Sequence, residues 1–290
     1  MTEGRSVFPT PRSITQRHAH MWKQLVSVLC VLTSPLVAHD FWLEPSSYRP
    51  SVDQRVDVQL VVGEHFVGDL VARKEERIVL FAAFDSVGTE TRILGRDGKS
   101  PAGLWKPSSA GLHVLGYRSN ATKIEIEAEK FEHYLVEEGL EHVIAERKSR
   151  GESASKGLEA YARCPKAIVV ARGATEPGAK ELGGFDRVLG LPLEIVPLAN
   201  PTTLQKDAKF SVRVLFQGAP LANALVGLMP KSEPAREVRL RTDAQGRVEF
   251  TPVAGGVHLV RGVHMTRAAD GAAHQWESQW ASLTCELPLR

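Results

Sequence analysis

The sequence lacks the short motifs that most often identify an enzyme. It contains no nucleophile elbow, no phosphate-binding or dinucleotide-binding glycine loop, and neither a CxxC nor an HExxH pattern. Aromatic residues make up only 7% of the chain, which disfavours a flat aromatic face that binds a polysaccharide. These absences close the usual routes to an enzyme assignment, and we expect the protein not to be an enzyme.

A long apolar run and a strong charge of one sign are missing as well. The most apolar run, Leu25–Leu32, is well short of the ~20 residues that span a bilayer. The formal net charge is +2, and it becomes −1 when residues 1–38 are left out. A nearly neutral chain offers no basic face to nucleic acid. We therefore expect neither a nucleic-acid partner nor a membrane span in the chain that follows residue 38.

Residues 1–38 have the three parts of a secretory leader. A basic start precedes the apolar run Leu25–Leu32, and a helix-breaking segment then leads to the small residue Ala38. Met21 is an alternative start, because the segment from Met21 to Ala38 is a compact leader by itself. We expect export, with cleavage after Ala38 and a mature chain that begins at His39.

Only two cysteines, Cys164 and Cys285, remain after such a cleavage. In an oxidising compartment they can pair. However, Cys164 lies beside a proline, and Cys285 lies in a strand-like run in the other half of the chain. We favour two separate buried thiols and leave the disulfide open.

Alternating apolar and polar residues predict strands through most of the mature chain. The alternation is clear at Val52–Val62 and at Lys209–Phe216. The charged segment Phe131–Lys148 instead has apolar residues near helical spacing, and we expect a further short helix at Leu158–Arg163 before a strand at Ala167–Ala171. The pattern predicts an all-β fold with a helical insert.

A turn at Ala199-Asn200-Pro201 divides the predicted strands into two groups. About seven short strands follow it in roughly 90 residues, which is typical of an immunoglobulin-like sandwich, although the Cys…Trp…Cys spacing of a true immunoglobulin domain is absent. We therefore predict a leader at 1–38, an N-terminal β-sandwich domain with a helical insert at 39–199, and a C-terminal immunoglobulin-like β-sandwich at 200–290.

His39 is the residue whose chemistry removal of the leader would change most. Cleavage would give it a free α-amine beside its imidazole, and the reference pKa values of these groups are ~8 and ~6.5. Both nitrogens can then chelate one metal ion, and another imidazole would complete a three-nitrogen site of the kind called a histidine brace. Such ligands suit Cu, Ni and Zn. The alternative is a frayed terminus, which the following Phe41-Trp42-Leu43 disfavours because it would anchor the chain in a core.

The remaining histidines differ in their sequence context. His264 and His258 lie six residues apart in one predicted strand, so alternation places both on one face. His65 lies between glycines and near two carboxylates. His133 and His142 are nine residues apart on the predicted helix, which is not a ligand spacing. The candidate metal ligands are His39, His264 and His65, with Asp69 and Glu277 as further carboxylate candidates.

Several segments of the mature chain together resemble one bacterial family. They are AHDFWLEP at 38–45, VGEHFVGD at 62–69, FEHYLVEEGL at 131–140, PLEIVP at 192–197, LFQGAPL at 215–221 and WESQWASLT at 276–284. The set resembles a periplasmic family described mainly as a domain of unknown function. Some of its members are the extra periplasmic component of energy-coupling-factor nickel/cobalt uptake systems.

The resemblance implies a periplasmic, metal-linked protein with a β-sandwich followed by an immunoglobulin-like domain. It carries His39 over as the first mature residue and His264 as the matching histidine of the late strand. We expect a protein that captures a Ni, Co, Cu or Zn ion through His39 and supplies an inner-membrane uptake transporter. A metal-free interaction or carbohydrate-binding module of two β-domains is the alternative. A copper oxygenase acting on polysaccharide is a third, which the low aromatic content disfavours.

Overall fold

The computed structural model describes Met1 and residues 39–178, 180–205 and 207–288. Apart from Met1, the predicted leader at residues 1–38 lies outside the described residues. From residue 39 onward the described chain belongs to one compact unit. Within these ranges, no helix combines the length and the apolar character needed to cross a membrane.

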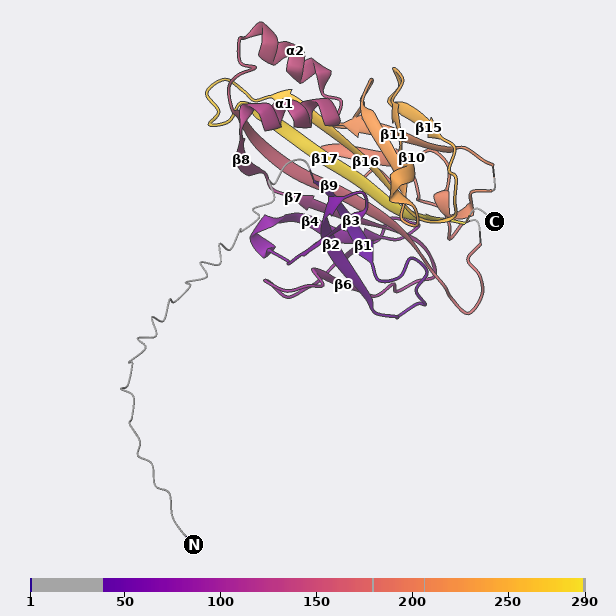
Figure 1. Ribbon diagram of the computed structural model, residues 1–290. Coiled ribbons are helices and arrows are strands. Elements are labelled where there is room, and N and C mark those ends of the chain that lie inside the picture. Colours follow the sequence, from indigo (N-terminus) through magenta and orange to yellow (C-terminus); the bar gives the residue numbers. More distant parts are fainter. Residues whose placement is uncertain (2–38, 179, 206, 289–290) are drawn as a thin grey trace. The chain divides into compact units, whose positions relative to one another are not determined.

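A nine-stranded sheet runs through the centre of this unit (Figure 1). Strands β9 and β17 pair in parallel, and the other neighbours in this sheet are antiparallel. Strand β7 pairs with residues 166–171 of β9, and β8 pairs with residues 157–161 of the same strand on the same edge. In spatial order the strands are β14 (Val238–Arg241), β13 (Leu225–Pro230), β16 (Gly256–Arg267), β17 (Trp276–Leu287), β9 (Gly157–Ala171), β7 (Gly111–Ser119), β4 (Ile78–Phe84) and β5 (Glu90–Arg92), with β8 (Thr122–Ile126) beside β9.

Two four-stranded sheets pack against the nine-stranded sheet. The first, named the N-terminal small sheet, contains β1 (Asp40–Pro45), β2 (Val56–Glu64), β3 (Val67–Val71) and β6 (Gly103–Trp105). The second, named the C-terminal small sheet, contains β10 (Leu193–Pro197), β11 (Phe210–Phe216), β12 (Ala219–Pro220) and β15 (Arg247–Phe250).

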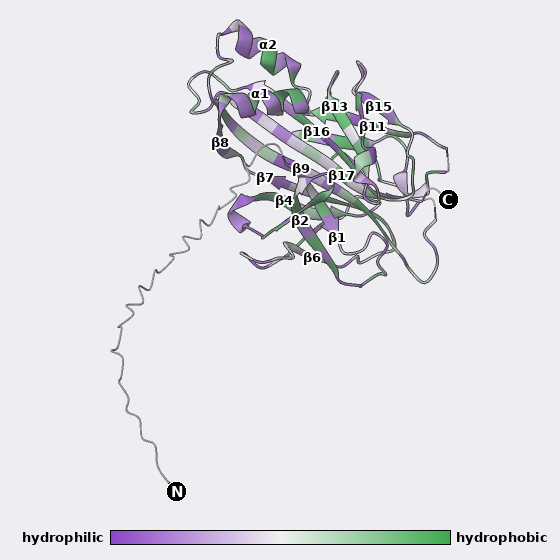
Figure 2. Ribbon diagram, viewed as in Figure 1, coloured by the Kyte–Doolittle hydropathy of each residue, from purple (hydrophilic) through white to green (hydrophobic). Residues whose placement is uncertain are grey.

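The two small sheets cover opposite faces of the nine-stranded sheet. Side chains alternate between the faces of a strand. On β9, Ala167 and Val169 pack with the N-terminal small sheet, whereas Cys164 and Ile168 pack with the C-terminal one. Figure 2 shows hydrophobic residues concentrated along the strands, while the helices are mostly hydrophilic. The prediction of an all-β fold built from β-sandwiches with a helical insert is confirmed.

The helical insert follows β8 and consists of two helices, α1 (Ala128–Glu137) and α2 (Glu141–Ser149). The apolar residues Phe131 and Tyr134 pack against Trp280 on the same face as the N-terminal small sheet. The predicted helical segment is thus confirmed, with a break at Gly139, whose φ of 65° is left-handed. Short 3-10 turns occur at Glu75–Arg77, Pro201–Thr203 and Pro234–Arg236.

The short helix predicted at Leu158–Arg163 is wrong, because these residues form the first half of β9. Leucine, glutamate and alanine favour a helix. In the folded chain, however, β8 pairs with one edge of this segment and β17 with the other. Backbone pairing on both edges outweighs the local preference, as tertiary context commonly does.

The predicted domain boundary between residues 199 and 200 stays a prediction. Strands β4, β5, β7, β8 and β9 precede it, and β13, β14, β16 and β17 follow it, yet all nine lie in one sheet. The parallel pairing of β9 with β17 joins the two groups, with Trp276 opposite Glu159 and Thr284 opposite Ala167.

Cys164 and Cys285 are both buried free thiols, as predicted. Burial raises the pKa of Cys164 to about 11 and that of Cys285 to about 12. Neither thiol is therefore poised as a thiolate near neutral pH.

Strand β1 fixes the chain directly after His39. Its Trp42 and Leu43 are 1% and 0% exposed. Ser282 Oγ donates a hydrogen bond to the carbonyl of Phe41 at 2.7 Å, and Thr284 Oγ1 donates one to the carbonyl of Leu43 at 2.8 Å. The frayed terminus is thus excluded from residue 40 onward, and β1 holds His39 at one corner of the N-terminal small sheet.

Candidate functional site

His39 lies beside the end of β2. Because Asp40 pairs with Gly63 in the antiparallel ladder, the next position outward places His39 next to Glu64. Nδ1 of His39 lies 3.0 Å from Oε1 of Glu64, and the two side chains are 26% and 59% exposed. An imidazole and a carboxylate therefore meet at an open corner of the sheet.

His264 lies on the opposite face of the nine-stranded sheet from His39. Its neighbours in β16, Val263 and Met265, pack with the helices, so alternation turns His264 toward the C-terminal small sheet. There its ring centroid lies 4.5 Å from that of Phe216 and 5.5 Å from that of His142, which reaches it from α2. Burial, with a contribution from His142, lowers the pKa of His264 to about 4. The structure does not bring His264 and His39 together.

His65 and the two further candidates also lie apart from one another. His65 is exposed at the tip of the β2–β3 hairpin, with a left-handed φ of 50°. Asp69 is exposed on β3, and Oε1 of Glu277 on β17 lies 3.1 Å from Nε2 of His274, from which it can accept a hydrogen bond. In the described part of the chain, no three histidine, cysteine, aspartate or glutamate side chains are grouped so that they could hold a metal ion.

A buried charge cluster connects the residue after His39 to the helical insert. Arg261 on β16 lies 3.3 Å from Asp40, 3.0 Å from Glu138 and 2.8 Å from Glu237. Burial raises the pKa of Asp40 to about 7, although the Arg261 charge acts in the opposite direction. The cluster fixes the start of β1 against the end of α1, and so helps to position His39.

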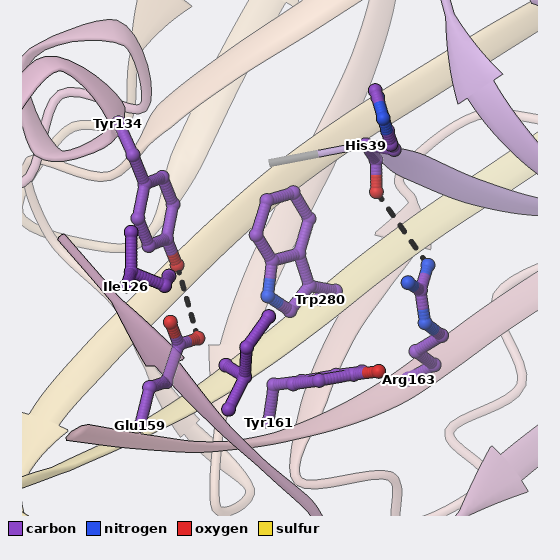
Figure 3. A pocket seen from close by; sticks show the side chains of 8 residues that line it. His39, Ile126, Tyr134, Glu159, Tyr161, Arg163 and Trp280 are labelled. Atoms are coloured by element: carbon purple, nitrogen blue, oxygen red, sulfur yellow. Dashed lines mark hydrogen bonds between the residues drawn. The ribbon is translucent and has the colours of Figure 1, made fainter. Parts of the chain in front are cut away.

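A cavity lies beside His39 on the face that carries α1 (Figure 3). It contains about 380 Å³ of space between atoms, with its open mouth included. Tyr134 from α1, Tyr161 from β9 and Trp280 from β17 provide aromatic walls. The rings of Tyr134 and Trp280 are stacked, with centroids 5.6 Å apart.

Glu159 is the buried carboxyl group of this cavity, at 2% exposure. Its Oε1 accepts hydrogen bonds from the hydroxyls of Tyr134, at 3.2 Å, and of Ser278. Trp280 Nε1 in turn donates to Ser278 Oγ at 3.1 Å. Burial raises the pKa of Glu159, and these hydrogen bonds oppose the shift. The network ties α1 to β9 and β17.

The sequence-based search for a site missed Glu159 and Arg163. In the helix predicted for this segment, Glu159 and Arg163 would lie on one face and Tyr161 on another. Read as a strand, the segment places all three on one face. The signal was present in the alternation of Glu159, Tyr161 and Arg163.

The fold defines an all-β sandwich protein, and the sequence places it in a family. The family model described as "Domain of unknown function (DUF4198)" matches residues 36–266. The chain therefore belongs to the DUF4198 family, as the resemblance of its segments to a domain of unknown function implies.

Three solved structures show weak similarity to this chain. The D0-D1 domain of intimin is 13% identical, covering 86% of this chain and 97% of its own, with a TM-score of 0.20. The fibronectin(III)-like modules of Clostridium thermocellum CbhA are 9% identical, covering 85% and 94%, with a TM-score of 0.19. Bacteroides ovatus SGBP-B in complex with a mixed-linkage heptasaccharide is 7% identical, covering 87% and 70%, at 0.18. TM-scores at this level support no inference about this chain. No curated protein matches it.

Proposed function

We propose that the exported and processed chain is a periplasmic metal-binding protein that captures a transition-metal ion at its new N-terminus. The observation that carries the proposal is the 3.0 Å approach of Nδ1 of His39 to Oε1 of Glu64. Cleavage after Ala38 would add a primary amine to the same residue. The α-amine and Nδ1 of His39 and the carboxylate of Glu64 would then form the ligand set.

The donor types in this set fit Ni, Co, Cu or Zn. Amine and imidazole nitrogens suit these ions, with Cu(II) favoured by intrinsic affinity, and a carboxylate adds a negative charge next to the cation. Glu64 replaces His264 and His65 as the proposed further metal ligand. His264 lies on the other face of the nine-stranded sheet, and His65 lies at a hairpin tip. The ligand set is therefore revised to His39 and Glu64.

We further propose that the bound ion is supplied to an uptake transporter in the inner membrane. The family resemblance supports this role, and so does the position of the pair. Nδ1 of His39 is itself buried, but the two side chains as a whole are partly exposed, so a partner protein would approach the ion from the Glu64 side. The rigid attachment of β1 keeps the corner in place during such a transfer.

The test compares the affinities of two chains for Cu(II) and Ni(II) by isothermal titration. One has a free α-amine at His39, and in the other this amine is acetylated. Acetylation keeps the imidazole but removes the amine as a ligand, so we expect affinity to fall by at least roughly tenfold, or about 1.4 kcal/mol. Glu64→Gln should weaken binding in the chain with the free α-amine, whereas His264→Gln should not. Equal affinity of the two chains would refute metal capture by the N-terminus.

A metal-free binding module is the second candidate function, and the cavity beside His39 favours it. Aromatic walls surround a buried carboxyl there, and the space that a water-sized molecule can occupy is about 30 Å³, enough for one end of a ligand but not for a whole one. Metal analysis of untagged protein purified from the periplasm separates the two functions. No bound metal, together with no uptake when metal is added, would favour the binding module. That the protein is not an enzyme stays a prediction.

A further inference from the structure

A second cavity opens between the N-terminal small sheet and the nine-stranded sheet. It adjoins the cavity beside His39, because Tyr161 and Arg163 line both of them. It contains about 840 Å³ of space between atoms, its open mouth included. Phe41 and Leu60 contribute apolar surface from one layer, and Tyr117 does so from the other.

Three cationic side chains line this second cavity. Lys74 and Arg77 come from the segment between β3 and β4, and Arg163 comes from β9. The described lining residues include no aspartate or glutamate. The hydrogen-bond partners of Arg77 are neutral, namely Asn120 and Thr122 together with a backbone carbonyl. The wall is thus apolar with a net positive charge.

Arg163 is the deepest of these cations. Its guanidinium lies over the rings of Phe41 and Tyr161, 4.5 and 5.2 Å from their centroids. It donates one long hydrogen bond, of 3.5 Å, to the carbonyl of His39. No carboxylate among the described residues forms an ion pair with it.

The fully buried cations Lys166 and Arg147 do have such a partner, whereas Arg163 is only partly buried. Lys166 lies 2.8 Å from Glu194, and Arg147 lies 2.7 Å from Glu132. Buried charges in proteins are normally paired, because removing an unpaired charge from water is costly. The guanidinium of Arg163 has the aromatic faces but no carboxylate at ion-pair distance, because Asp40 and Glu159 act on it only at longer range. Its N–H donors beyond the contacts with His39 and Tyr161 are left for another acceptor.

We propose that the second cavity binds a small organic anion: a carboxylate with an apolar body. The carboxylate would pair with Arg163 at the inner end, with Lys74 and Arg77 adding positive charge at the rim. The apolar body would lie between the two layers against Phe41, Leu60 and Tyr117. A guanidinium binds a carboxylate through two parallel hydrogen bonds, which matches the donors that Arg163 keeps available.

The charge and the apolar wall together select this ligand class. A neutral apolar molecule would leave the three cations without a partner, and an organic cation would be repelled by them. An inorganic anion would pair with the cations but leave the aromatic and aliphatic wall in water. The space that a water-sized molecule can occupy is about 300 Å³, at the lower end of the range of about 300 to 1,000 Å³ that is usual for small-molecule sites.

Three probes of equal chain length test the proposal: octanoate, octan-1-ol and octylamine, titrated into the chain that begins at His39. Binding is followed by isothermal titration and by amide chemical shifts around β2, β3 and β7. We expect octanoate to bind at least roughly tenfold more tightly than octan-1-ol. Octylamine should bind more weakly still.

Four variants locate the site. Lys74→Gln and Arg163→Gln remove a cation that lines the cavity, and each should weaken octanoate binding by roughly three- to tenfold. Ala72→Phe keeps every charge but narrows the mouth, and it should also weaken binding. Lys123→Gln is the matched control, because Lys123 is an exposed cation of β8 that does not line this cavity.

Lys74 is exposed, so its replacement tests the charge without disturbing the core. Equal binding of octanoate and octan-1-ol would overturn the proposal, as would unchanged binding in Lys74→Gln and Ala72→Phe. Absence of octanoate binding by the unaltered chain would also overturn it. Metal affinity measured on the Lys74→Gln chain should stay unchanged, since Lys74 does not line the cavity beside His39.

Discussion

At the scale of single residues, the environment of each histidine separates a chelating role from a structural one. His39 lies at a partly exposed corner with a carboxylate beside its Nδ1. His264 lies in an apolar contact with Phe216 and His142. The first environment favours an ion, and the second favours a neutral imidazole that is part of the packing.

Acid should therefore destabilise the fold through His264. Its folded-state pKa of about 4 lies below the ordinary 6.5, so the unfolded chain takes up the proton first as the pH falls through this interval. Stability should decrease from about pH 6.5 to about pH 4, with a contribution of about 2 kcal/mol by pH 5. Urea unfolding of His264→Gln near pH 7 and near pH 5 should show a correspondingly smaller decrease.

The control for this measurement is His133→Gln, since His133 is 77% exposed on α1. Its replacement should leave the pH dependence of the unfolding free energy as it is. If His264→Gln loses as much stability toward pH 5 as the unaltered chain does, the imidazole is not held neutral by its surroundings.

At the level of single residues, the sequence could predict those site features that depend only on neighbouring residues in the chain. The unusual chemistry of a histidine after a cleavage site can be read from residues 38 and 39 alone. Glu64 as the partner of His39 requires the register of β1 on β2, which the alternation of apolar residues does not fix to a single pairing. The cations Lys74, Arg77 and Arg163 come from separate segments, so only the fold brings them together.

At the scale of elements, β1 is the connection between the core and the candidate metal site. It pairs with β2, and its carbonyls accept hydrogen bonds from the hydroxyls of Ser282 and Thr284 on β17. The sequence predicted an anchor from the apolar character of Phe41-Trp42-Leu43. It did not predict the polar contacts, because a buried threonine in a strand resembles any other β-branched residue.

Replacement of Thr284 by valine should loosen β1 while leaving the core volume nearly constant. The carbonyl of Leu43 would lose its hydroxyl donor in a buried position, at a cost of about 1 to 3 kcal/mol. Amide hydrogen exchange at residues 40–45 should accelerate more than exchange in β16. Uniform exchange across both strands would show that β1 is held by its packing and not by this hydrogen bond.

Strand β9 shows why some elements could be predicted and others could not. Its second half, around Ala167–Ala171, is apolar and β-branched, and it was predicted as a strand. Its first half has helix-favouring residues, and it becomes a strand because β8 and β17 pair with both of its edges. Those partners come from distant segments, so the local sequence carries only a weak signal for them.

At the scale of the whole compact unit, the two predicted halves share one sheet. The nine strands come from both sides of residue 200, and the buried pair Lys166–Glu194 joins β9 to the C-terminal small sheet. Separate domains unfold independently when few contacts cross between them. Here the ladder between β9 and β17 crosses the predicted boundary along most of the length of both strands.

The mature chain should therefore unfold in one cooperative transition. Differential scanning calorimetry of residues 39–290 should show a single peak, with the calorimetric enthalpy equal to the van't Hoff enthalpy. A fragment ending at residue 199 should fail to fold, because β9 would lose its partner β17. Two resolved peaks, or a folded fragment, would support independent domains instead.

The central claim is that cleavage turns His39 into a two-nitrogen chelator beside Glu64. Electron paramagnetic resonance of the Cu(II)-loaded chain that begins at His39 tests it most directly, because nitrogen hyperfine coupling reports the ligand atoms. We expect coupling to the amine and to the imidazole, and loss of the amine coupling when the α-amine of His39 is acetylated. An identical spectrum from the two chains would contradict it.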